Sequence, residues 1–413
     1  MTIGRQGLDA LLADATVQRL FVALGAEGAE TRIVGGAVRN ALMGFPVHDI
    51  DCATTALPQD VLRLARQAGL KAVPTGIDHG TVTIVIEGRP FEVTTLRADA
   101  RTNGRHAEVV FGSDFEADAR RRDFTINALY LDATGTLFDP VGGLPDIAAR
   151  KVRFIGDALA RIREDYLRIM RFFRFHAAYG EGTPDRDGFL ACIRGREGLD
   201  RLSRERVRAE LLRLLGARNA ATSLEAMSAG GLLHVILGGV PDHGRFARAA
   251  AASDDTLLRL CALAVMVPED AERLRERLRL SKAEFERLHK LVGLTAHLHG
   301  RVELLSERDI RRLAVKHTAP MLADAVMLTA GETTPRLASA AAELLTRYLS
   351  GSEPVPSFPF SGAQLAGKGV EPGPRMGVIL HKARDLWLEA DCPADRAVLD
   401  FLLTEAIGQD DSA

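Results

Sequence analysis

Hydrophobic and polar positions follow two different patterns along the chain, and the change falls near residue 155. In the first part, short β-branched runs with the two-residue period of strands are interspersed with stretches of helical period. From about Asp157 to the end, nearly every stretch has apolar residues at helical spacing, with brief breaks. The pattern therefore predicts an α+β fold, with a mixed head that contains a small sheet and an all-helical remainder.

The elements predicted for the head begin with a helix over about residues 7–24. They continue with a strand at "TRIV", a helix at "AVRNALMG", a strand through "HDIDCATT", a helix that starts near Pro58, a hairpin at "TVTIVIEGRPFEVTTLR", a helix at "RRDFTINALY" and two short strands. In the remainder, "LARIREDYLRIMRFFRFHAAY" and "SRERVRAELLRLLG" each have the period of a helix. The stretch "GSEPVPSFPFSG" predicts a break before a last helical segment.

Composition and charge are those of a globular protein without a global attraction to nucleic acid. The 413 residues carry a formal net charge of −2, and 46% are hydrophobic and 26% charged. No run approaches the roughly 18 apolar residues of a membrane span, and the N-terminal stretch lacks the apolar core of a signal peptide. Four widely spaced cysteines predict neither a zinc site nor a disulfide framework, which fits a cytoplasmic protein.

The basic residues are mostly arginine, because the chain has only seven lysines among its 53 basic residues. The planar fork of arginine suits phosphates and carboxylates, although the nucleotide composition of a gene produces the same bias. Because the net charge is close to zero, a phosphate-binding surface must be local and must be argued position by position.

The stretch "FPVHDIDCATT" places two aspartates on either side of Ile50. On a strand, residues i and i+2 point to the same face, so Asp49 and Asp51 would project together while Ile50 is buried. Two like charges raise each other's pKa unless a cation lies between them, and Mg²⁺ bound through carboxylates and substrate phosphates meets that need. Two solvated loop acids are the alternative. A phosphohydrolase metal site, suggested by His48 beside Asp49, is disfavoured because no second His–Asp cluster follows.

A glycine-containing turn precedes the aspartates along the chain. In "IVGGAVRN", Gly35 and Gly36 would let a phosphate approach the backbone at the start of a helix, where the first amide groups are unpaired. Arg39 lies one turn into that helix, within reach of the same phosphate. Two glycines before a helix are often only a turn, but such a turn ahead of a carboxylate pair favours a nucleotide-binding site.

Two arginine-rich stretches complete the candidate chemistry. In "DARRRDFTINAL", Asp123 beside Arg122 either caps the following helix or helps to aim an arginine at a nucleotide. In "REDYLRIMRFFRF", surface pairs between helix neighbours would contribute roughly a few tenths of a kcal/mol. Alternatively, the arginine forks hydrogen-bond the edge of a base while the carboxylate accepts from an exocyclic amine. The residues concerned follow one another at steps of three among bulky apolar side chains: Asp165, Arg168, Arg171 and Arg174.

Taken together, these stretches resemble the class II CCA tRNA nucleotidyltransferase and bacterial poly(A) polymerase family. The similarity is carried, in the family's order and over about residues 32–216, by "GGAVRN", "HDIDCATT", "RRDFTINAL", "DPVGGLPD", "REDYLRIMRFFRF" and "LSRERVRAELLRLL". A weaker likeness continues in "FSGAQLAGKGVEPGPRMGVIL". The chain departs from the family at Asn40, where the first motif usually ends in aspartate, and it lacks the histidine pattern of the appended HD phosphohydrolase domain.

The resemblance implies a division of the chain and roles for its residues. The implied parts are a DNA polymerase β-like nucleotidyltransferase head with a small mixed sheet (1–155), a helical neck with the nucleobase-recognition helix (156–230), a tRNA-binding helical body (231–350) and a helical tail (351–413). Asp49 and Asp51 match the catalytic pair that binds the metal, with Mg²⁺ as the cofactor. Contacts to the nucleotide are implied for Gly36, Arg39, Arg122, Asp165, Arg168, Arg171 and Arg174, whereas no role is carried over to Asn40.

The activity implied by the resemblance is template-independent addition of CCA to the 3′ end of tRNA from CTP and ATP. A poly(A) polymerase that uses ATP alone and a CC-adding enzyme that stops before A are alternatives with the same chemistry. A catalytically inactive tRNA-binding protein is the alternative of another class, and the intact acid pair argues against it. The long segment between Thr95 and Arg120 favours complete CCA addition, because the family uses a mobile loop there when it changes to ATP.

Overall fold

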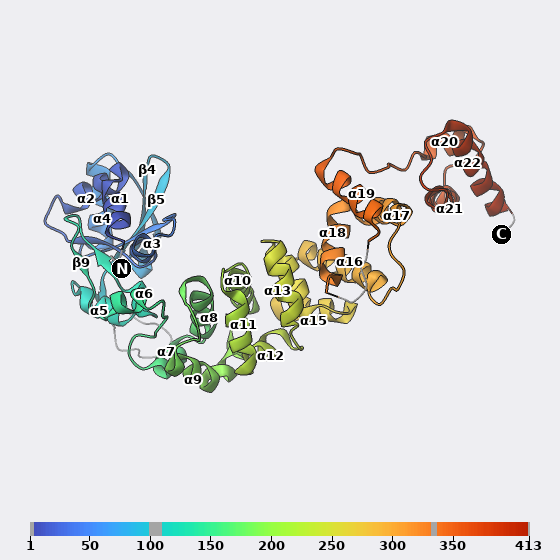
Figure 1. Ribbon diagram of the computed structural model, residues 1–413. Helices are drawn as coiled ribbons and strands as arrows, with labels where there is room; N and C mark the ends of the chain where they lie inside the picture. The colour runs from blue at the N-terminus through green and yellow to red at the C-terminus, as the bar shows by residue number, and fades with distance from the viewer. Residues whose placement is uncertain (1–3, 99–109, 332–336, 412–413) are drawn as a thin grey trace. The chain divides into compact units, whose positions relative to one another are not determined.

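The computed structural model describes residues 4–98, 110–331 and 337–411, which divide into two compact units, Met1–Ile236 and Leu237–Ala413. The first unit contains all the described strands, followed by a run of helices, and the second unit is entirely helical where it is described (Figure 1). The main sheet ends at Phe138. The predicted α+β class and the change of pattern near residue 155 are therefore confirmed, whereas the finer division into neck, body and tail stays a prediction.

The main sheet of the first unit has seven strands in the order β3-β4-β5-β2-β1-β8-β9. Strands β2 and β5 run parallel, and the other neighbouring pairs of this sheet are antiparallel. The predicted hairpin is confirmed as β4 and β5, whose ends pair at Ile86 and Arg89. The strands are β1 (Thr31–Val34), β2 (Ile50–Thr54), β3 (Lys71–Gly76), β4 (Thr81–Ile86), β5 (Arg89–Thr95), β8 (Tyr130–Leu131) and β9 (Leu137–Phe138).

Strand β2 lies inside this sheet, between β1 and β5. One face of the three strands carries Ile33, Ile50 and Phe91, each of which is at most 1% exposed. Burying such a side chain stabilises the fold by roughly 1.5–3 kcal/mol, so the burial of Ile50 fixes which residues of β2 point to the other face. Asp51 consequently points away from the Ile50 core, as the sequence pattern predicted.

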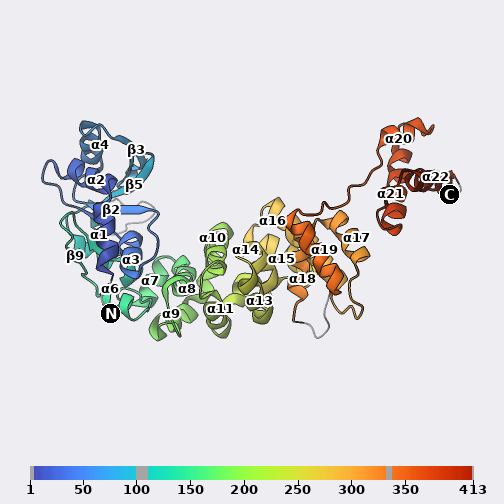
Figure 2. The same cartoon turned by 45° about the horizontal axis from the view of Figure 1, so that its top comes forward.

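Short helices surround the sheet in the first unit (Figures 1 and 2). Helix α4, which begins at Pro58 as predicted, packs on β3, β4 and β5, and α3 packs on β1 and β2. The small sheet of β6 (Arg97–Ala98) and β7 (Val110–Phe111) flanks residues 99–109, so much of the long segment predicted before Arg120 lies outside the described residues. The helices of this part are α1 (Arg5–Ala13), α2 (Ala15–Gly25), α3 (Gly36–Met43), α4 (Pro58–Gln67), α5 (Phe115–Arg120), α6 (Gly143–Ala148) and the 3-10 turns η1 (Ile77–His79) and η2 (Thr125–Asn127).

Two helix predictions for the head were wrong. The single helix expected over residues 7–24 is two helices, because Asp14 leaves the helical conformation and its carboxylate accepts the amide of Thr16 at 2.8 Å to start α2. The helix expected at "RRDFTINALY" is the short turn η2 followed by β8. Phe124 forms an isolated bridge with Phe154, and Tyr130 pairs with Val34 of β1, so sheet contacts override the helical period there.

The described remainder of the chain is helical, with the predicted break after α19. One further prediction was wrong, since the expected helix from residue 159 to 179 is interrupted at Asp165, which adopts an extended conformation with φ −151°. The helices are α7 (Ala158–Glu164), α8 (Leu167–Tyr179), α9 (Arg186–Gly195), η3 (Arg196–Arg201), α10 (Arg204–Leu215), α11 (Ala220–Ala229), α12 (Leu232–Leu237), α13 (His243–Ala252), α14 (Thr256–Ala264), α15 (Pro268–Leu278), α16 (Lys282–Leu298), α17 (Glu307–His317), α18 (Ala319–Thr329), α19 (Ser339–Ser350), α20 (Gly362–Gly367), α21 (Pro374–Glu389) and α22 (Arg396–Asp411).

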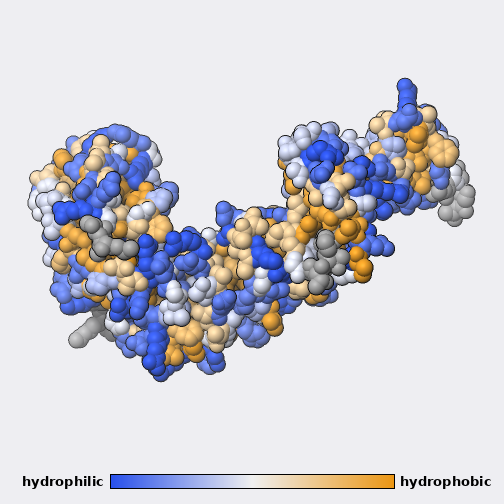
Figure 3. Space-filling model, viewed as in Figure 1, coloured by the Kyte–Doolittle hydropathy of each residue, from blue (hydrophilic) through white to orange (hydrophobic). Residues whose placement is uncertain are grey.

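The four cysteines are free thiols in this structure. Cys52, Cys192 and Cys261 are buried, and Cys392 is half-buried. Burial raises the pKa of each of these thiols. On the face shown in Figure 3, hydrophobic residues are interspersed with hydrophilic ones. Within the described helices, none has both the length and the apolar content needed to cross a bilayer.

Candidate active site

Two aspartates lie at the start of β2, as the sequence predicted. Asp51 belongs to the strand and Asp49 directly precedes it, and both are exposed while Ile50 between them is buried. Desolvation raises the pKa of Asp51 above its ordinary value, and the nearby carboxylates of Glu92 and Asp49 add to the effect while Arg122 opposes it. The site therefore holds negative charge that the protein's own cations do not fully neutralise.

Glu92 is a site residue that the sequence analysis missed. It is the direct neighbour of Asp51 in the parallel pairing of β2 with β5, so the two side chains share one face of the sheet. The available signal was an acid between Phe91 and Val93 in a strand whose alternate residues are buried. The pairing of β2 with β5, which lie about 40 residues apart, cannot be read from either stretch alone. Without that pairing, Glu92 looks like an ordinary solvent-facing residue.

The glycine turn lies at the end of β1, beside the aspartates. Gly35 has φ +74° and ψ −122°, a conformation open to glycine alone, and its amide donates to the carbonyl of Leu129 at 3.1 Å. Helix α3 starts at Gly36. A Cβ atom on Gly35 would lie 3.6 Å from Nη1 of Arg122, so the missing side chain keeps the space in front of that guanidinium open.

Arg122 is held against this turn by a buried carboxylate. Its Nε donates to Oδ2 of Asp118 at 3.0 Å, and the hydroxyl of Tyr130 donates to the same oxygen at 2.8 Å. Arg121 also pairs with Asp118, which is only 1% exposed. Burial acts to lower the pKa of Arg122, but Asp118 and Tyr130 outweigh it and raise the pKa above its ordinary value. The guanidinium is thus a fixed positive charge close to Asp51.

Arg39, for which a nucleotide contact is predicted, is buried and hydrogen-bonded to three side chains. Its side chain is 5% exposed and donates to Asn40 Oδ1 at 2.8 Å, to Tyr179 Oη at 2.7 Å and to the side chain of Asn127. Its guanidinium also stacks on the Tyr179 ring, 3.8 Å from the centroid. Burial lowers the pKa of Arg39 to about 10, so it stays charged at neutral pH. Through its hydrogen bonds to Asn127 and Tyr179, Arg39 of α3 connects this helix to η2 and α8.

Two arginines of α8 pair with acids on other elements. Nε of Arg171 donates to Oδ2 of Asp123 at 2.7 Å, which joins α8 to the segment before η2. Arg174 pairs with Glu210 of α10, which is 5% exposed. Burial acts to lower the pKa of Arg174 and outweighs the opposite effect of Glu210. Both guanidinium groups also lie over the ring of the buried Phe175, so the two arginines lie beside a core, as predicted. Each therefore has a partner within the protein in addition to any ligand.

Asp165 and Arg168 lie at the break between α7 and α8. Oδ1 of Asp165 accepts the amide of Leu167 at 3.0 Å, and Oδ2 pairs with Nη2 of Arg206 at 2.8 Å. Arg168 donates to the carbonyl of Arg161 at 2.7 Å and pairs with Glu164. Asp165 and Arg168 therefore bind separate partners instead of pairing as helix neighbours. Asp165 lies in the break, and Arg168 lies in the first turn of α8.

Six of the nine predicted residues fall into three groups, and the other three are Gly36 at the start of α3 and the paired Arg171 and Arg174 of α8. The first joins Asp49 and Asp51 to Arg122 across the glycine turn. The second is the network around Arg39, whose members Asn127 and Tyr179 had no sequence signal because each comes from a different element. The third surrounds the α7–α8 break.

Asp49 and Asp51 have the donor chemistry for a hard divalent cation. Two neighbouring carboxylates, with the pKa of Asp51 raised by burial and by its acidic neighbours, supply oxygen ligands and negative charge. No group of three or more His, Cys, Asp or Glu residues in the described part of the chain is arranged to hold a metal alone. The pair therefore fits an ion whose remaining ligands come from a phosphate substrate and water, rather than a closed structural site.

Comparison with known proteins identifies related chains. Residues 31–153 match the family described as "Poly A polymerase head domain", and residues 189–243 match "Probable RNA and SrmB- binding site of polymerase A". The mitochondrial CCA tRNA nucleotidyltransferase 1 of Danio rerio is 36% identical over 376 residues, which cover 87% of this chain and 83% of that protein. The CCA-adding enzyme of Geobacillus thermodenitrificans is 40% identical over 231 residues, covering 55% of this chain and 56% of the relative.

Solved structures agree with these matches. The Bacillus stearothermophilus CCA-adding enzyme in complex with CTP superposes with a TM-score of 0.75 at 25% identity, over 96% of this chain and 98% of that one. The Thermotoga maritima CCA-adding enzyme complexed with tRNA-CCA superposes with a TM-score of 0.68 at 20% identity, over 96% and 98% of the two chains. The second likeness supports the fold, and the first supports both the fold and the family.

Proposed function

Because this chain belongs to the CCA tRNA nucleotidyltransferase family, we propose that it adds C, C and A to the 3′ end of tRNA, with CTP and ATP as substrates. The observation that carries the proposal is the pair Asp49 and Asp51, beside a glycine turn that keeps the Arg122 guanidinium accessible. Uncompensated carboxylates next to a fixed cation suit a triphosphate and its metal ion.

In this proposal the 3′ hydroxyl of the tRNA attacks the α-phosphate of the nucleotide. The hydroxyl loses its proton to solvent, a bond forms between its oxygen and the α-phosphorus, the bond to the bridging oxygen breaks, and pyrophosphate leaves. Asp49 and Asp51 would hold Mg²⁺, which supplies charge stabilisation and a more acidic hydroxyl when bound. Arg122 would bind the triphosphate in the space beside Gly35, and the turn at Gly35 and Gly36 would let it come close to the backbone.

The α8 side of the site would select the base. Asp165 and Arg168 would hydrogen-bond the base of CTP or ATP, and their separate partners Arg206 and Glu164 would fix their orientation. Arg171 and Arg174 would contribute further contacts from the same helix. Since Arg39 is buried and hydrogen-bonded to Asn40, Asn127 and Tyr179, we propose that it positions the glycine turn against α8 in addition to any contact with phosphate.

The experiment that tests this function is incorporation of labelled nucleotides into tRNA transcripts that end before CCA. We expect CTP to be added twice and ATP once, in a Mg²⁺-dependent reaction that releases pyrophosphate. Incorporation of ATP alone into several unrelated RNAs would indicate a poly(A) polymerase, and arrest after two C residues would indicate a CC-adding enzyme. No pyrophosphate release with intact tRNA binding would indicate an inactive RNA-binding protein.

We also propose a cytoplasmic location, from the widely spaced free cysteines. The vertebrate relatives carry "mitochondrial" in their names, so a mitochondrial location is the alternative. Cell fractionation followed by detection of the protein distinguishes the two.

A further inference from the structure

Asn40 stands where the family's first motif usually ends in aspartate, and the resemblance implies no role for it. It is half-buried in α3, and its side chain forms hydrogen bonds in two directions. Oδ1 accepts from Nη2 of Arg39 at 2.8 Å and from Nε at 3.2 Å. Nδ2 donates to the backbone carbonyl of Pro46 at 2.9 Å.

An ionised aspartate could not make both sets of bonds. The guanidinium of Arg39 has donors alone and the carbonyl of Pro46 accepts alone, so the amide oxygen must face Arg39 and the amide nitrogen must face Pro46. A carboxylate would keep the first contact but has no hydrogen to donate, and it would place a negative oxygen against the carbonyl oxygen. The departure from the family's motif therefore adds a contact that the usual residue cannot make.

The contact falls on the loop that joins α3 to β2 and ends at Asp49, the first of the two proposed metal ligands. This loop has neither helix nor strand, and two side chains bind its carbonyl groups. Asn40 binds the carbonyl of Pro46, and Nη2 of Arg89 lies 3.4 Å from the carbonyl of His48. Because Pro46 lies three residues before Asp49, the amide of Asn40 restrains the chain shortly before that carboxylate.

The same contacts join the loop to α8. Nη2 of Arg39 also donates to Tyr179 Oη at 2.7 Å, and the Tyr179 ring meets the Phe45 ring edge-on with centroids 5.6 Å apart. The amide of Phe45 in turn donates to the carbonyl of Asn40 at 2.9 Å. Asn40, Arg39, Tyr179 and Phe45 thus form a closed ring of contacts. Loss of the side chain of Asn40 would loosen the loop relative to the helix that carries the proposed base-selecting arginines.

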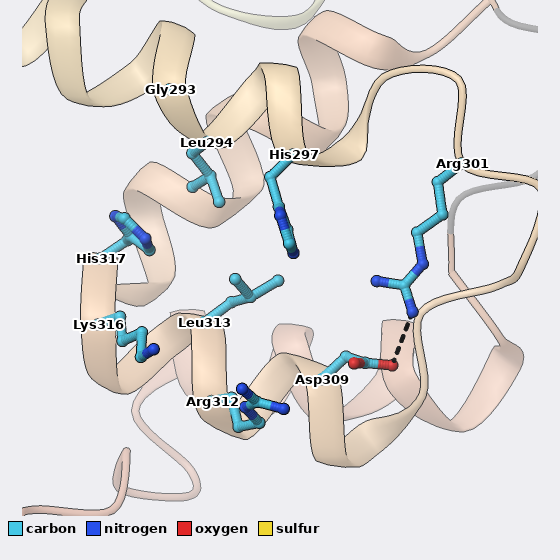
Figure 4. Close-up of a pocket in the computed structure, with 9 residues that line it drawn as sticks. All are labelled: Gly293, Leu294, His297, Arg301, Asp309, Arg312, Leu313, Lys316 and His317. Carbon is cyan, nitrogen blue, oxygen red and sulfur yellow. Dashed lines mark ion pairs between the residues drawn. The ribbon is translucent and has the colours of Figure 1, made fainter. Parts of the chain in front are cut away.

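The cations that line a groove in the second unit need no comparable explanation. The groove lies between α16 and α17, has a volume of about 510 Å³ and is lined by Arg301, Arg312 and Lys316 among others (Figure 4). It belongs to residues 231–350, for which the family resemblance already implies tRNA binding. Asn40 and its partners lie in the first unit, beside the proposed nucleotide site.

We propose that Asn40 is a positioning residue for the metal site, whose amide holds the loop so that Asp49 stays beside Asp51. The inference rests on the function proposed above and adds to it a residue that acts through the bond to Pro46. Asn40 touches neither the metal nor the nucleotide in this role.

Arg39 determines which replacements of Asn40 are informative. Its side-chain partners Asn40, Asn127 and Tyr179 are uncharged, and no acid in the described part of the chain forms an ion pair with it. Asn40→Asp would give this buried guanidinium a charged partner, so the fold should tolerate the change while the donor to Pro46 is lost. Asn40→Ala loses the same donor without adding charge.

The test measures metal binding by the full-length protein, with Mn²⁺ in place of Mg²⁺ and CTP present, by electron paramagnetic resonance. We expect the Kd for Mn²⁺ to rise by about three- to tenfold in both Asn40→Asp and Asn40→Ala, because both lose one hydrogen bond that holds the loop. The Mg²⁺ concentration for half-maximal incorporation of CTP into a tRNA transcript lacking CCA should rise by a similar factor. CTP binding without metal should be unchanged in Asn40→Ala.

Gln18 provides the matched control. Its Nε2 donates to the carbonyl of Leu12 at 2.7 Å, which is also an amide-to-carbonyl bond across six residues, at an exposed position of α2. Gln18→Glu and Gln18→Ala therefore remove the same kind of bond by the same chemical changes. Both should bind Mn²⁺ as the wild type does, and thermal unfolding should show a similar small loss of stability for Gln18→Ala and Asn40→Ala.

Two results would overturn the proposal. If Asn40→Ala binds Mn²⁺ as well as Gln18→Ala does, Asn40 only stabilises the fold. If Asn40→Asp alone is impaired, the added charge and not the lost bond is responsible. Should Asn40→Ala not fold, Asn40→Asp is compared with Gln18→Glu, and its CTP binding without metal separates the two causes, because only an added charge would weaken it.

These measurements also separate Asn40 from the proposed activity. A wild-type protein that binds Mn²⁺ with CTP but adds no nucleotide would overturn the activity, while the comparison of Mn²⁺ affinities still decides the role of Asn40. Normal addition of CCA, with equal Mn²⁺ affinity in all variants, would overturn the role of Asn40 alone.

Discussion

Single residues of the first unit differ mainly in how well their charge is compensated. Asp118 of α5 lies between two arginines and a tyrosine hydroxyl, whereas Asp51 of β2 lies near the carboxylates of Glu92 and Asp49. The sequence pattern predicted that Asp49 and Asp51 project beside a buried Ile50, because a two-residue period needs no knowledge of distant contacts. It could not predict Glu92, whose role depends on which strands become neighbours, or the contact of Asp118 with Tyr130, which comes from another element.

The first prediction concerns Asp51. Asp51→Ala should abolish nucleotide incorporation, because it removes one of two proposed metal ligands, while CTP binding in the absence of metal largely survives. The control is Asp9→Ala, which removes an exposed aspartate from α1 and should keep full activity. Single-turnover incorporation and equilibrium CTP binding measure the two effects, and normal turnover by Asp51→Ala would refute the metal assignment.

Gly35 gives a prediction that separates strain from function. Gly35→Ala should lower incorporation by at least about tenfold, because a Cβ atom would enter the space beside Arg122 and would force a conformation that costs roughly 1–3 kcal/mol. Gly28→Ala is the matched control, since Gly28 also has a positive φ of +80° but nothing lies within 4 Å of the added atom. Both variants should lose stability in thermal unfolding, but only Gly35→Ala should lose activity.

Asp118 makes stability depend on pH. Burial would raise its pKa, but Arg122, Arg121 and Tyr130 outweigh it and hold the pKa below the ordinary value. Its charge therefore stabilises the fold above about pH 4, and this contribution is lost as the pH falls through the lowered pKa. Asp118→Asn should destabilise the first unit by roughly 3 kcal/mol at pH 7, because two arginines lose their charged partner. Thermal unfolding should show the difference from the wild type shrinking below pH 4, and an unchanged difference would contradict the pairing.

At the scale of elements, the sequence predicted the ends of a helix or strand correctly where the residues at that end determine it. Pro58 starts α4, and the β-branched runs around Glu87 and Gly88 form the hairpin. The predictions failed where another element decides, as at η2, where Phe124 is drawn into a bridge with Phe154. Asp165 is similar, because helical period continues through it while its side chain caps Leu167 and binds Arg206.

The break at Asp165 gives a prediction at this scale. Asp165→Ala should reduce stability by about 1 kcal/mol through loss of the cap and should weaken selection of CTP and ATP over UTP and GTP. Arg206→Ala removes the ion pair but leaves the cap and the carboxylate in place. Competition assays with all four nucleotides should show misincorporation for Asp165→Ala and a smaller effect for Arg206→Ala. Equal selectivity in both variants and the wild type would exclude Asp165 from base recognition.

At the scale of the whole chain, the two units have separate cores. The first is built on the sheet around Ile33, Ile50 and Phe91, and the second contains a cluster around Trp387 and Leu365 in its last helices. The change of pattern near residue 155 predicted where strands end, but not the boundary at residue 236, because helices on both sides of that boundary have the same period. The helical character of the remainder was readable from the sequence, whereas the assignment of its helices to units was not.

This organisation predicts the behaviour of a fragment. A chain that ends at Gly239 keeps the complete first unit and α12, so it should fold and bind CTP with an affinity close to that of the full chain. It should bind tRNA at least about tenfold more weakly, since it lacks the proposed body and tail. Circular dichroism, CTP titration and tRNA anisotropy test these expectations. Full tRNA affinity in the fragment would contradict them and would show that the RNA-binding surface lies in the first unit.

The unequal burial of the four thiols has a practical consequence. Cys52, next to Asp51 in β2, is shielded from alkylating reagents, as are Cys192 and Cys261, while Cys392 between α21 and α22 is half-buried. A maleimide dye applied to the unmodified protein should therefore attach at one position, in the last helical segment. The natural chain then carries a single fluorescent reporter on its second unit, without any engineered cysteine.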